Sequence, residues 1–141
     1  MKRWSAIAMV LSFSCMTASA ATFVYVSNAE DGDIATYRMT DAGELQPGPR
    51  AKAGSVVMPM AVSPDRRFLY AGVRSKPYSV IAYSIDPGTG ELRQLSSSPL
   101  AESFPYISLD KTGRFLFGAS YAGHLISVNA VGRDGRSDGH D

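Results

Sequence analysis

Polar side chains that could bind or activate a substrate follow short apolar runs in this sequence. Arg74 directly ends the run Phe68 to Val73, and its planar guanidinium suits a phosphate or carboxylate group. Tyr121 holds the equivalent position after a later run and could donate a hydrogen bond. His124 follows shortly after and is suited to general base catalysis near neutral pH. We therefore predict that Arg74 and Tyr121 bind substrate and that His124 is catalytic.

Each of these residues also has a structural interpretation. Arg74 is otherwise an exposed turn charge near Lys76, and Tyr121 is otherwise a packing residue at the rim between repeats. A solvent-facing turn is the alternative position for His124. The sequence leaves these alternatives open.

Other polar residues fall on loops expected at the same end of the strands. Asn28 is a further candidate for substrate binding. Glu30 could serve as a base, although its neighbours Asp31 and Asp33 indicate an ordinary acidic hairpin loop. His140 lies among polar residues near the C-terminus and is assigned no role.

No pattern typical of a metal or cofactor site occurs in the sequence. Cys15 is the single cysteine, and there is no His-x-x-x-His pair and no spaced carboxylate loop of the calcium type. We therefore expect neither a metal ion nor another cofactor.

The elements that must position the candidate residues are repeats. Phe23–Ser27 resembles Phe68–Gly72, which resembles Phe115–Ala119, at spacings of 45 and 47 residues. A period of about 46 residues with three to four short strands is the size of one β-propeller blade. A second set of short segments agrees, at spacings of 46 and 45 residues: Ile34–Tyr37, Val80–Tyr83 and Leu125–Val128.

The repeats predict an all-β fold, a partial β-propeller of about three blades in units 21–53, 54–99 and 100–131. Only the second unit is expected to be complete, with strands at Met60–Val62, Phe68–Val73, Ser79–Ile85 and Leu92–Ser97. The aromatic residues that recur with the repeat are expected in the blade core: Tyr25, Tyr37, Phe68, Tyr70, Tyr83, Phe115 and Phe117.

Each outer unit is expected to lack one strand. The first unit begins at Phe23, so it supplies only the second, third and fourth strands of a blade. The third unit has strands at Tyr106–Leu109, Phe115–Ser120 and Leu125–Val131. No apolar residue follows, so residues 132–141 are predicted to form a disordered polar tail. Such a run of blades is too short to close a propeller by itself.

Residues 1–20 have the three-part pattern of a secretory signal peptide. Two cations precede an apolar run from Trp4 to Met16, and Ala18 and Ala20 are small residues suited to cleavage after Ala20. A membrane anchor is the alternative, but the run is shorter than the ~20 residues that span a bilayer. We expect a periplasmic or secreted protein with no membrane contact after cleavage.

The charge balance disfavours nucleic acid as a partner. Residues 1–20 hold two of the 14 Lys and Arg residues and none of the 13 Asp and Glu residues, so the remainder is slightly acidic. Nothing concentrates positive charge as phosphate backbones require. With 45% hydrophobic and 19% charged residues, the composition is that of one globular domain of undetermined oligomeric state.

One long motif resembles a known family. The run Pro59–Arg74, followed by Ile81–Ile85, resembles the bacterial 6-phosphogluconolactonases of the seven-bladed propeller type. Ile107–Asp110, Gly113–Phe117 and Ser120–Gly123 continue the match, which covers roughly residues 22–131. The family's cysteine–histidine–serine stretch, at the start of the fourth blade, has no counterpart in this sequence.

The resemblance implies hydrolysis of a lactone ester, with a small-molecule lactone as the partner. Because export separates the protein from phosphorylated cytoplasmic sugars, we expect an unphosphorylated sugar lactone or a carboxymuconolactone-like compound. Two alternatives remain: a non-catalytic exported propeller that binds a ligand or partner, and an inactive truncated remnant.

Overall fold

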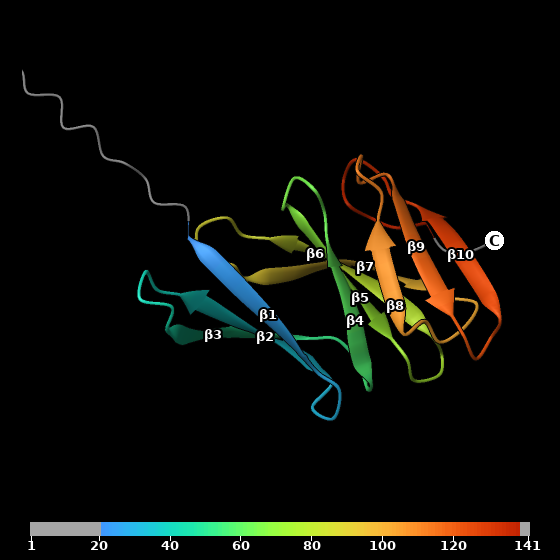
Figure 1. Ribbon diagram of the computed structural model, residues 1–141, viewed down its shortest axis with the longest axis horizontal. Coiled ribbons are helices and arrows are strands. Elements are labelled where there is room, and N and C mark those ends of the chain that lie inside the picture. The colour runs from blue at the N-terminus through green and yellow to red at the C-terminus, as the bar shows by residue number, and fades with distance from the viewer. Residues whose placement is uncertain (1–20, 139–141) are drawn as a thin grey trace, which may run out of the picture.

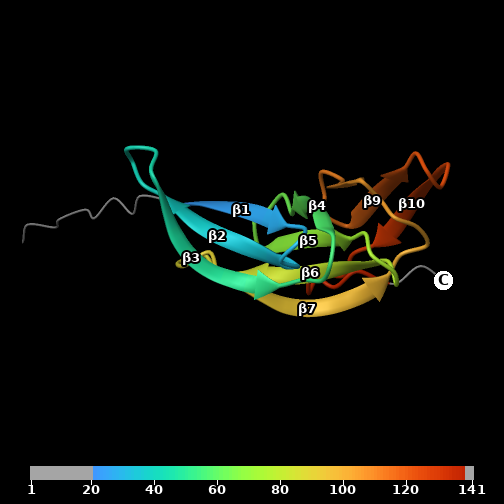
Figure 2. The same ribbon diagram turned by 90° about the horizontal axis from the view of Figure 1, so that it is seen from below.

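The computed structural model of the protein describes residues 21–138. Its strands form three antiparallel sheets that stand side by side in chain order (Figures 1 and 2). The expected signal segment and cleavage site lie outside the described residues, as do residues 139–141. Within the described part, no helix is long and apolar enough to cross a membrane.

Each sheet has the strand order of a propeller blade. Blade 1 contains β1 (Thr22–Asn28), β2 (Asp33–Met39) and β3 (Leu45–Lys52). Blade 2 contains β4 (Val57–Val62), β5 (Phe68–Val73), β6 (Ser79–Ile85) and β7 (Leu92–Pro99). Blade 3 contains β8 (Tyr106–Leu109), β9 (Phe115–Ser120) and β10 (Leu125–Ala130). The fold is the predicted partial propeller with one four-stranded blade, although β4 begins earlier than the expected Met60.

Aspartate side chains shape the tight turns between these strands. Asp110, before β9, accepts hydrogen bonds from the amides of Arg114 at 2.8 Å and Phe115 at 3.0 Å. The hydrogen bond from Thr112 is the largest cause that lowers the pKa of Asp110 to about 2. Asp86 similarly accepts from the Gly88 amide at 2.9 Å. The carboxylates of these aspartates accept hydrogen bonds from backbone amides that have no backbone carbonyl as partner in the turn.

Side chains alternate between two faces of each blade, as along any β-strand. We call the face toward the next blade in the chain the forward face, and the opposite one the back face. The forward face of blade 1 packs on the back face of blade 2 around Ile34, Val57, Leu69, Ala71, Val73, Ile81, Tyr83 and Leu92. The forward face of blade 2 packs on the back face of blade 3 around Phe68, Tyr70, Val80, Ala82, Phe104, Ile107, Leu116 and Val131.

The register of the third repeat differs from the prediction by one residue. In blade 2, Tyr83 of β6 pairs with Leu69 of β5. The residue of β9 equivalent to Leu69 is Leu116, and it pairs with Asn129 of β10. Val128, the predicted counterpart of Tyr83, lies on the opposite, forward face. Matching apolar residues gave the wrong register because a buried asparagine occupies this position in blade 3.

The segment that follows β10 is packed as far as it is described, which corrects the predicted disordered tail. Val131 and Ser137 form an antiparallel bridge, and Ser137 is only 5% exposed. Its carbonyl accepts a hydrogen bond from Ser98 Oγ at 2.6 Å, and the Gly135 carbonyl accepts one from the Tyr70 hydroxyl at 2.9 Å. The segment packs without apolar side chains because its backbone bonds to blade 2 and to the end of β10.

Two aromatic residues expected in the core are exposed, and Tyr37 is only half-buried, on the back face of blade 1. Phe115 is 42% exposed and Phe117 is 37% exposed, and both lie on the forward face of blade 3. Ile126 and Val128 lie on the same face and are more exposed still. The prediction of a core position is wrong for these residues because none of the described residues covers this face.

Candidate functional site

Five loops lie at one end of the three blades, which we call the loop edge. They leave the second strand of each blade or lead into the inner strands, at residues 29–32, 53–56, 74–78, 100–105 and 121–124. Consecutive antiparallel strands bring these connections to the same end of each sheet. The loop edge therefore contains Arg74, Tyr121 and His124, while Asn28 is the last residue of β1 at the same end.

Backbone hydrogen bonds join three of these loops through Val56. Its amide donates to the Ala29 carbonyl at 2.9 Å, and its carbonyl accepts from the Arg74 amide at 3.1 Å. The φ angle of Val56 is 60°, a conformation that costs a residue other than glycine about 1–3 kcal/mol. Ser75 Oγ adds a hydrogen bond to the Ser55 carbonyl at 2.8 Å. This network fixes the backbone from which the Arg74 side chain extends.

The Arg74 side chain is anchored by a loop residue and by a residue of β4. Its Nε donates to Ser103 Oγ at 3.0 Å, and its Nη1 lies 3.3 Å from the Sδ atom of Met58. The side chain is half-buried, and its other N–H groups have no hydrogen-bond partner among residues 21–138. The structure thus presents an oriented guanidinium that can bind a carboxylate, a phosphate or a polarised carbonyl.

The loop that carries Ser103 also carries a carboxylate, that of Glu102. Glu102 Oε1 accepts a hydrogen bond from the Ser103 amide at 2.7 Å. A Cβ atom added to Gly123 would lie 2.5 Å from Glu102 Cγ, so the Glu102 side chain packs directly on the loop that carries Tyr121 and His124. The loop at residues 100–105 therefore contacts Arg74 through Ser103 and the loop of blade 3 through Glu102.

The other predicted residues of blade 3 are more loosely held. Tyr121 is 75% exposed, and His124 is exposed with a φ angle of 52°. Neither side chain makes a hydrogen bond within the described part of the chain. Both lie on the loop against which Glu102 packs, but neither contacts Arg74 by a hydrogen bond.

Asn28 belongs to a separate polar cluster in blade 1. Its Nδ2 donates to Asp33 Oδ1 at 2.9 Å, and this bond is the first cause that lowers the pKa of Asp33. Arg50 contacts both Asp33 and Asp31 at 2.8 Å. These contacts show a structural use for Asn28 and for the acidic loop beside Glu30.

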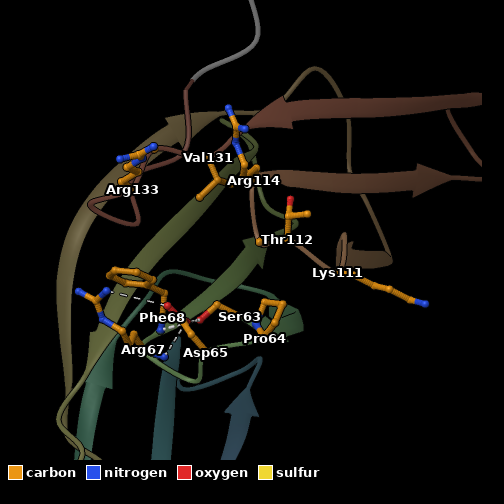
Figure 3. A pocket seen from close by; sticks show the side chains of 12 residues that line it. Ser63, Pro64, Asp65, Arg67, Phe68, Lys111, Thr112, Arg114, Val131 and Arg133 are labelled. Carbon is orange, nitrogen blue, oxygen red and sulfur yellow. Dashed lines mark hydrogen bonds and ion pairs between the residues drawn. The ribbon is translucent and has the colours of Figure 1, made fainter.

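A cleft of about 600 Å³ lies at the opposite end of blades 2 and 3. Its walls carry the cations Arg67, Lys111, Arg114 and Arg133, and Figure 3 shows Lys111 extending away from the others. The Arg67 guanidinium lies 5.1 Å from the centre of the Phe68 ring. None of the predicted site residues lines this cleft.

The described residues offer no arrangement for a metal ion. Between Ala21 and Asp138, no group of three or more His, Cys, Asp or Glu side chains lies close enough together to hold one.

Comparison with known proteins relates the chain to a family. A family profile described as "Lactonase, 7-bladed beta-propeller" matches residues 14–141. The chain belongs to this lactonase family. The 6-phosphogluconolactonase of Serratia proteamaculans is 41% identical over 112 residues, which are 79% of this chain and 33% of that protein. That of Cronobacter sakazakii is 42% identical over 105 residues, 74% of this chain and 31% of that protein.

Two solved structures also resemble this chain in fold. The periplasmic gluconolactonase of Pseudomonas aeruginosa has a TM-score of 0.69 and 27% identity, and covers 83% of this chain and 36% of that one. A candidate 6-phosphogluconolactonase from Bacteroides fragilis has a TM-score of 0.76, 22% identity, and covers 82% of this chain and 33% of that one. At 22% identity, the Bacteroides fragilis structure supports only the fold of this chain. The lactonase-family chain thus spans about a third of the length of the curated relatives given above.

Sequence reasoning missed three residues at the loop edge of this lactonase-family chain. Glu102 and Ser103 lie in a loop that is longer than the equivalent residues 53–56, so the repeat gave them no counterpart. Val56 was missed because nothing in the sequence indicates that a valine adopts a positive φ angle. Placing residues 100–105 at the same end as Arg74 could have found the first two.

Proposed function

We propose that this chain forms part of the active site of a lactone hydrolase. The proposal is supported by membership of the lactonase family and by relatives described as 6-phosphogluconolactonases. The structural observation that carries it is the Arg74 guanidinium, which Ser103 and Met58 hold at the loop edge with further N–H groups left for a ligand. Arg74 would bind the lactone carbonyl or the carboxylate of the product.

The reaction adds water across the ring ester. The water oxygen bonds to the carbonyl carbon, the ring C–O bond breaks, and the ring oxygen takes up a proton to give a hydroxy acid. Such a reaction needs a base for the water and donors for the oxyanion that develops. Arg74 supplies donors and positive charge, while Glu102 and His124 are the two candidate bases at the loop edge. Tyr121 would contact the sugar hydroxyls.

For the substrate we propose an unphosphorylated sugar lactone, with a carboxymuconolactone-like compound as the second choice. The signal-like pattern of residues 1–20 supports a periplasmic or secreted location, where phosphorylated sugar intermediates are not supplied. The similarity to a periplasmic gluconolactonase from Pseudomonas aeruginosa supports the same choice.

Hydrolysis of glucono-1,5-lactone by the purified protein, followed by acid release at constant pH, tests the proposal. We expect turnover above the spontaneous rate and a higher kcat/KM than for the 6-phosphorylated lactone. Arg74→Ala should lower kcat/KM at least tenfold, about 1.4 kcal/mol of transition-state stabilisation. Arg93→Ala, an exposed arginine on β7, is the matched control and should leave kcat/KM unchanged. A wild-type rate equal to the spontaneous rate would contradict the proposal.

Ligand binding without turnover is the second candidate function. It is favoured by the difference between the anchored Arg74 and the exposed His124, since a held guanidinium is sufficient for binding whereas hydrolysis also needs a positioned base. Calorimetry with gluconate separates the two functions. Binding that is lost in Arg74→Ala, with no hydrolysis of the lactone, would assign a binding role.

A further inference from the structure

Met58 is an oxidisable side chain in direct contact with the guanidinium of the candidate site. Its Sδ atom lies 3.3 Å from Nη1 of Arg74, and the residue is 45% exposed. A thioether sulfur is only a weak hydrogen-bond acceptor, so this contact leaves the guanidinium available to a ligand. A chemical change at the sulfur therefore acts directly on the group that is proposed to bind the substrate.

A β-bulge in β4 fixes the backbone of Met58. Met58 and Pro59 together lie opposite the single residue Gly72 of β5. Proline has no N–H group to donate to a neighbouring strand, and it is therefore tolerated at such bulges. The Met58 carbonyl accepts a hydrogen bond from Ser27 Oγ of blade 1 at 3.0 Å. Blades 1 and 2 thus hold the backbone of Met58 beside the loop that carries Arg74.

The exposure of Met58 belongs to the inner edge of the stack of blades. Blade 2 has a neighbouring blade on each side, and β4 contacts both β1 and β8 (Figure 1). The inner strands of a propeller border its central channel. Met58 is therefore open to small solutes wherever the candidate site is open to its substrate.

The other methionines of residues 21–138 differ from Met58 in burial or in position. Met60, two residues along β4, is partly buried and packs against the core between blades 1 and 2. Met39 is 39% exposed but ends β2, at the opposite end of blade 1 from the loop edge. A peroxide must reach the sulfur to oxidise it. We therefore expect oxidation of Met58 before Met60, with Met39 as an exposed methionine remote from Arg74.

We propose that Met58 is a site of reversible oxidation that controls ligand binding by Arg74. This control rests on the proposed function, in which Arg74 binds the ligand. A lone pair of the sulfur forms a bond to one oxygen of hydrogen peroxide, the O–O bond breaks, and the second oxygen leaves as water with both protons. The thioether is oxidised by two electrons to a sulfoxide, and the peroxide is reduced. Two thiols reverse the change through a methionine sulfoxide reductase, giving the thioether, a disulfide and water.

The sulfoxide changes what Arg74 offers to a ligand. Its oxygen carries partial negative charge and accepts hydrogen bonds far better than the thioether sulfur does. Because the sulfur already lies beside Nη1, this oxygen would accept a hydrogen bond from the guanidinium, while the bond from Nε to Ser103 stays in place. The ligand then competes with an internal acceptor. We expect the Kd for gluconate to rise about tenfold, the scale of one hydrogen bond to a charged group.

Treatment of the purified protein with hydrogen peroxide tests the proposal. Trypsin releases Met58 and Met60 in the peptide 53–66 and Met39 in the peptide 39–50, so tandem mass spectrometry measures each sulfoxide separately. We expect the ¹⁵N resonance of the Arg74 Nε–H group to shift as Met58 is oxidised. The two methionine sulfoxide reductases, one for each sulfoxide epimer, should restore both the resonance and the Kd.

Three variants separate the effect of Met58 from oxidation elsewhere in the chain. Met58→Leu keeps a similar volume and lacks the sulfur, so its Arg74 resonance and its Kd should not respond to peroxide. Met39→Leu should respond to peroxide as the wild type does. Met58→Gln places an amide oxygen on the atom equivalent to Sδ, so it should show the raised Kd without any peroxide.

Two results would overturn the proposal. One is a Met58 that stays reduced while Met60 is oxidised. The other is complete oxidation of Met58 with the Arg74 resonance or the Kd for gluconate unchanged. Failure of the proposed function is a different result, since the untreated protein would then bind no gluconate while the Arg74 resonance would still report the contact with the sulfoxide.

Discussion

The Tyr25 hydroxyl and the Gly90 carbonyl are joined by a 2.9 Å hydrogen bond between blades 1 and 2. Burial raises the pKa of Tyr25 to about 12, so the hydroxyl remains a donor at any ordinary pH. Tyr25→Phe removes the donor and leaves the carbonyl without this partner. We expect the free energy of unfolding to fall by about 1–2 kcal/mol, measured by urea denaturation.

Tyr37→Phe is the control for this change. Tyr37 lies in the same blade, is half-buried, and its hydroxyl has no hydrogen-bond partner among residues 21–138. An equal loss of stability in both variants would show that the bond between Tyr25 and Gly90 contributes nothing specific.

The turn glycines provide a second test of how blades are joined. Gly90→Ala combines the cost of a left-handed alanine, about 1–2 kcal/mol, with overpacking against Phe23, about 1–3 kcal/mol. Gly43→Ala has the same backbone cost with open space around it. Gly90→Ala should therefore be the more destabilising by urea denaturation. Equal losses would mean that Phe23 does not press on the turn.

The turn at Asp110 predicts a loss of stability in acid. Its hydrogen bonds hold the pKa near 2, below its ordinary value of 3.8. The stabilisation is therefore present above about pH 4 and is lost as the pH falls toward 2. In Asp110→Asn the urea midpoint should change less between pH 5 and pH 2 than in the wild type. The control is Glu91→Gln at an exposed position, whose urea midpoint should depend on pH as in the wild type. The same pH dependence in Asp110→Asn as in the wild type would contradict the prediction.

Glu102 and His124 are competing candidates for the base in lactone hydrolysis. If Glu102 accepts the proton from water, Glu102→Gln should lower kcat at least a hundredfold with little change in KM, and His124→Gln should be nearly silent. The reverse result would assign the base to His124. Equal, small effects of both changes would place the base on another residue.

The architecture was largely predictable, because each blade repeats the same strand pattern. The run at Phe23, Phe68 and Phe115 located the second strand of all three blades. The buried Asn129 broke the apolar pattern, and the backbone contacts of 132–138 left no mark in the composition. At the candidate site, the position of Arg74 was predictable because it directly follows a strand motif, and its role stays a prediction. The positions of Ser103 and Glu102 were not predictable, because they lie in a loop without a counterpart in the earlier repeat.

The central claim is that the anchored guanidinium of Arg74 is the ligand-binding group of this lactonase-family chain. The Nε–H resonance of Arg74 in a ¹⁵N NMR spectrum, assigned by its absence in Arg74→Lys, reports this directly. Titration with gluconate should shift that resonance saturably while the resonances of Arg67 and Arg114 in the opposite cleft stay in place. A titration that shifts Arg67 and Arg114 and leaves Arg74 unchanged would contradict the claim.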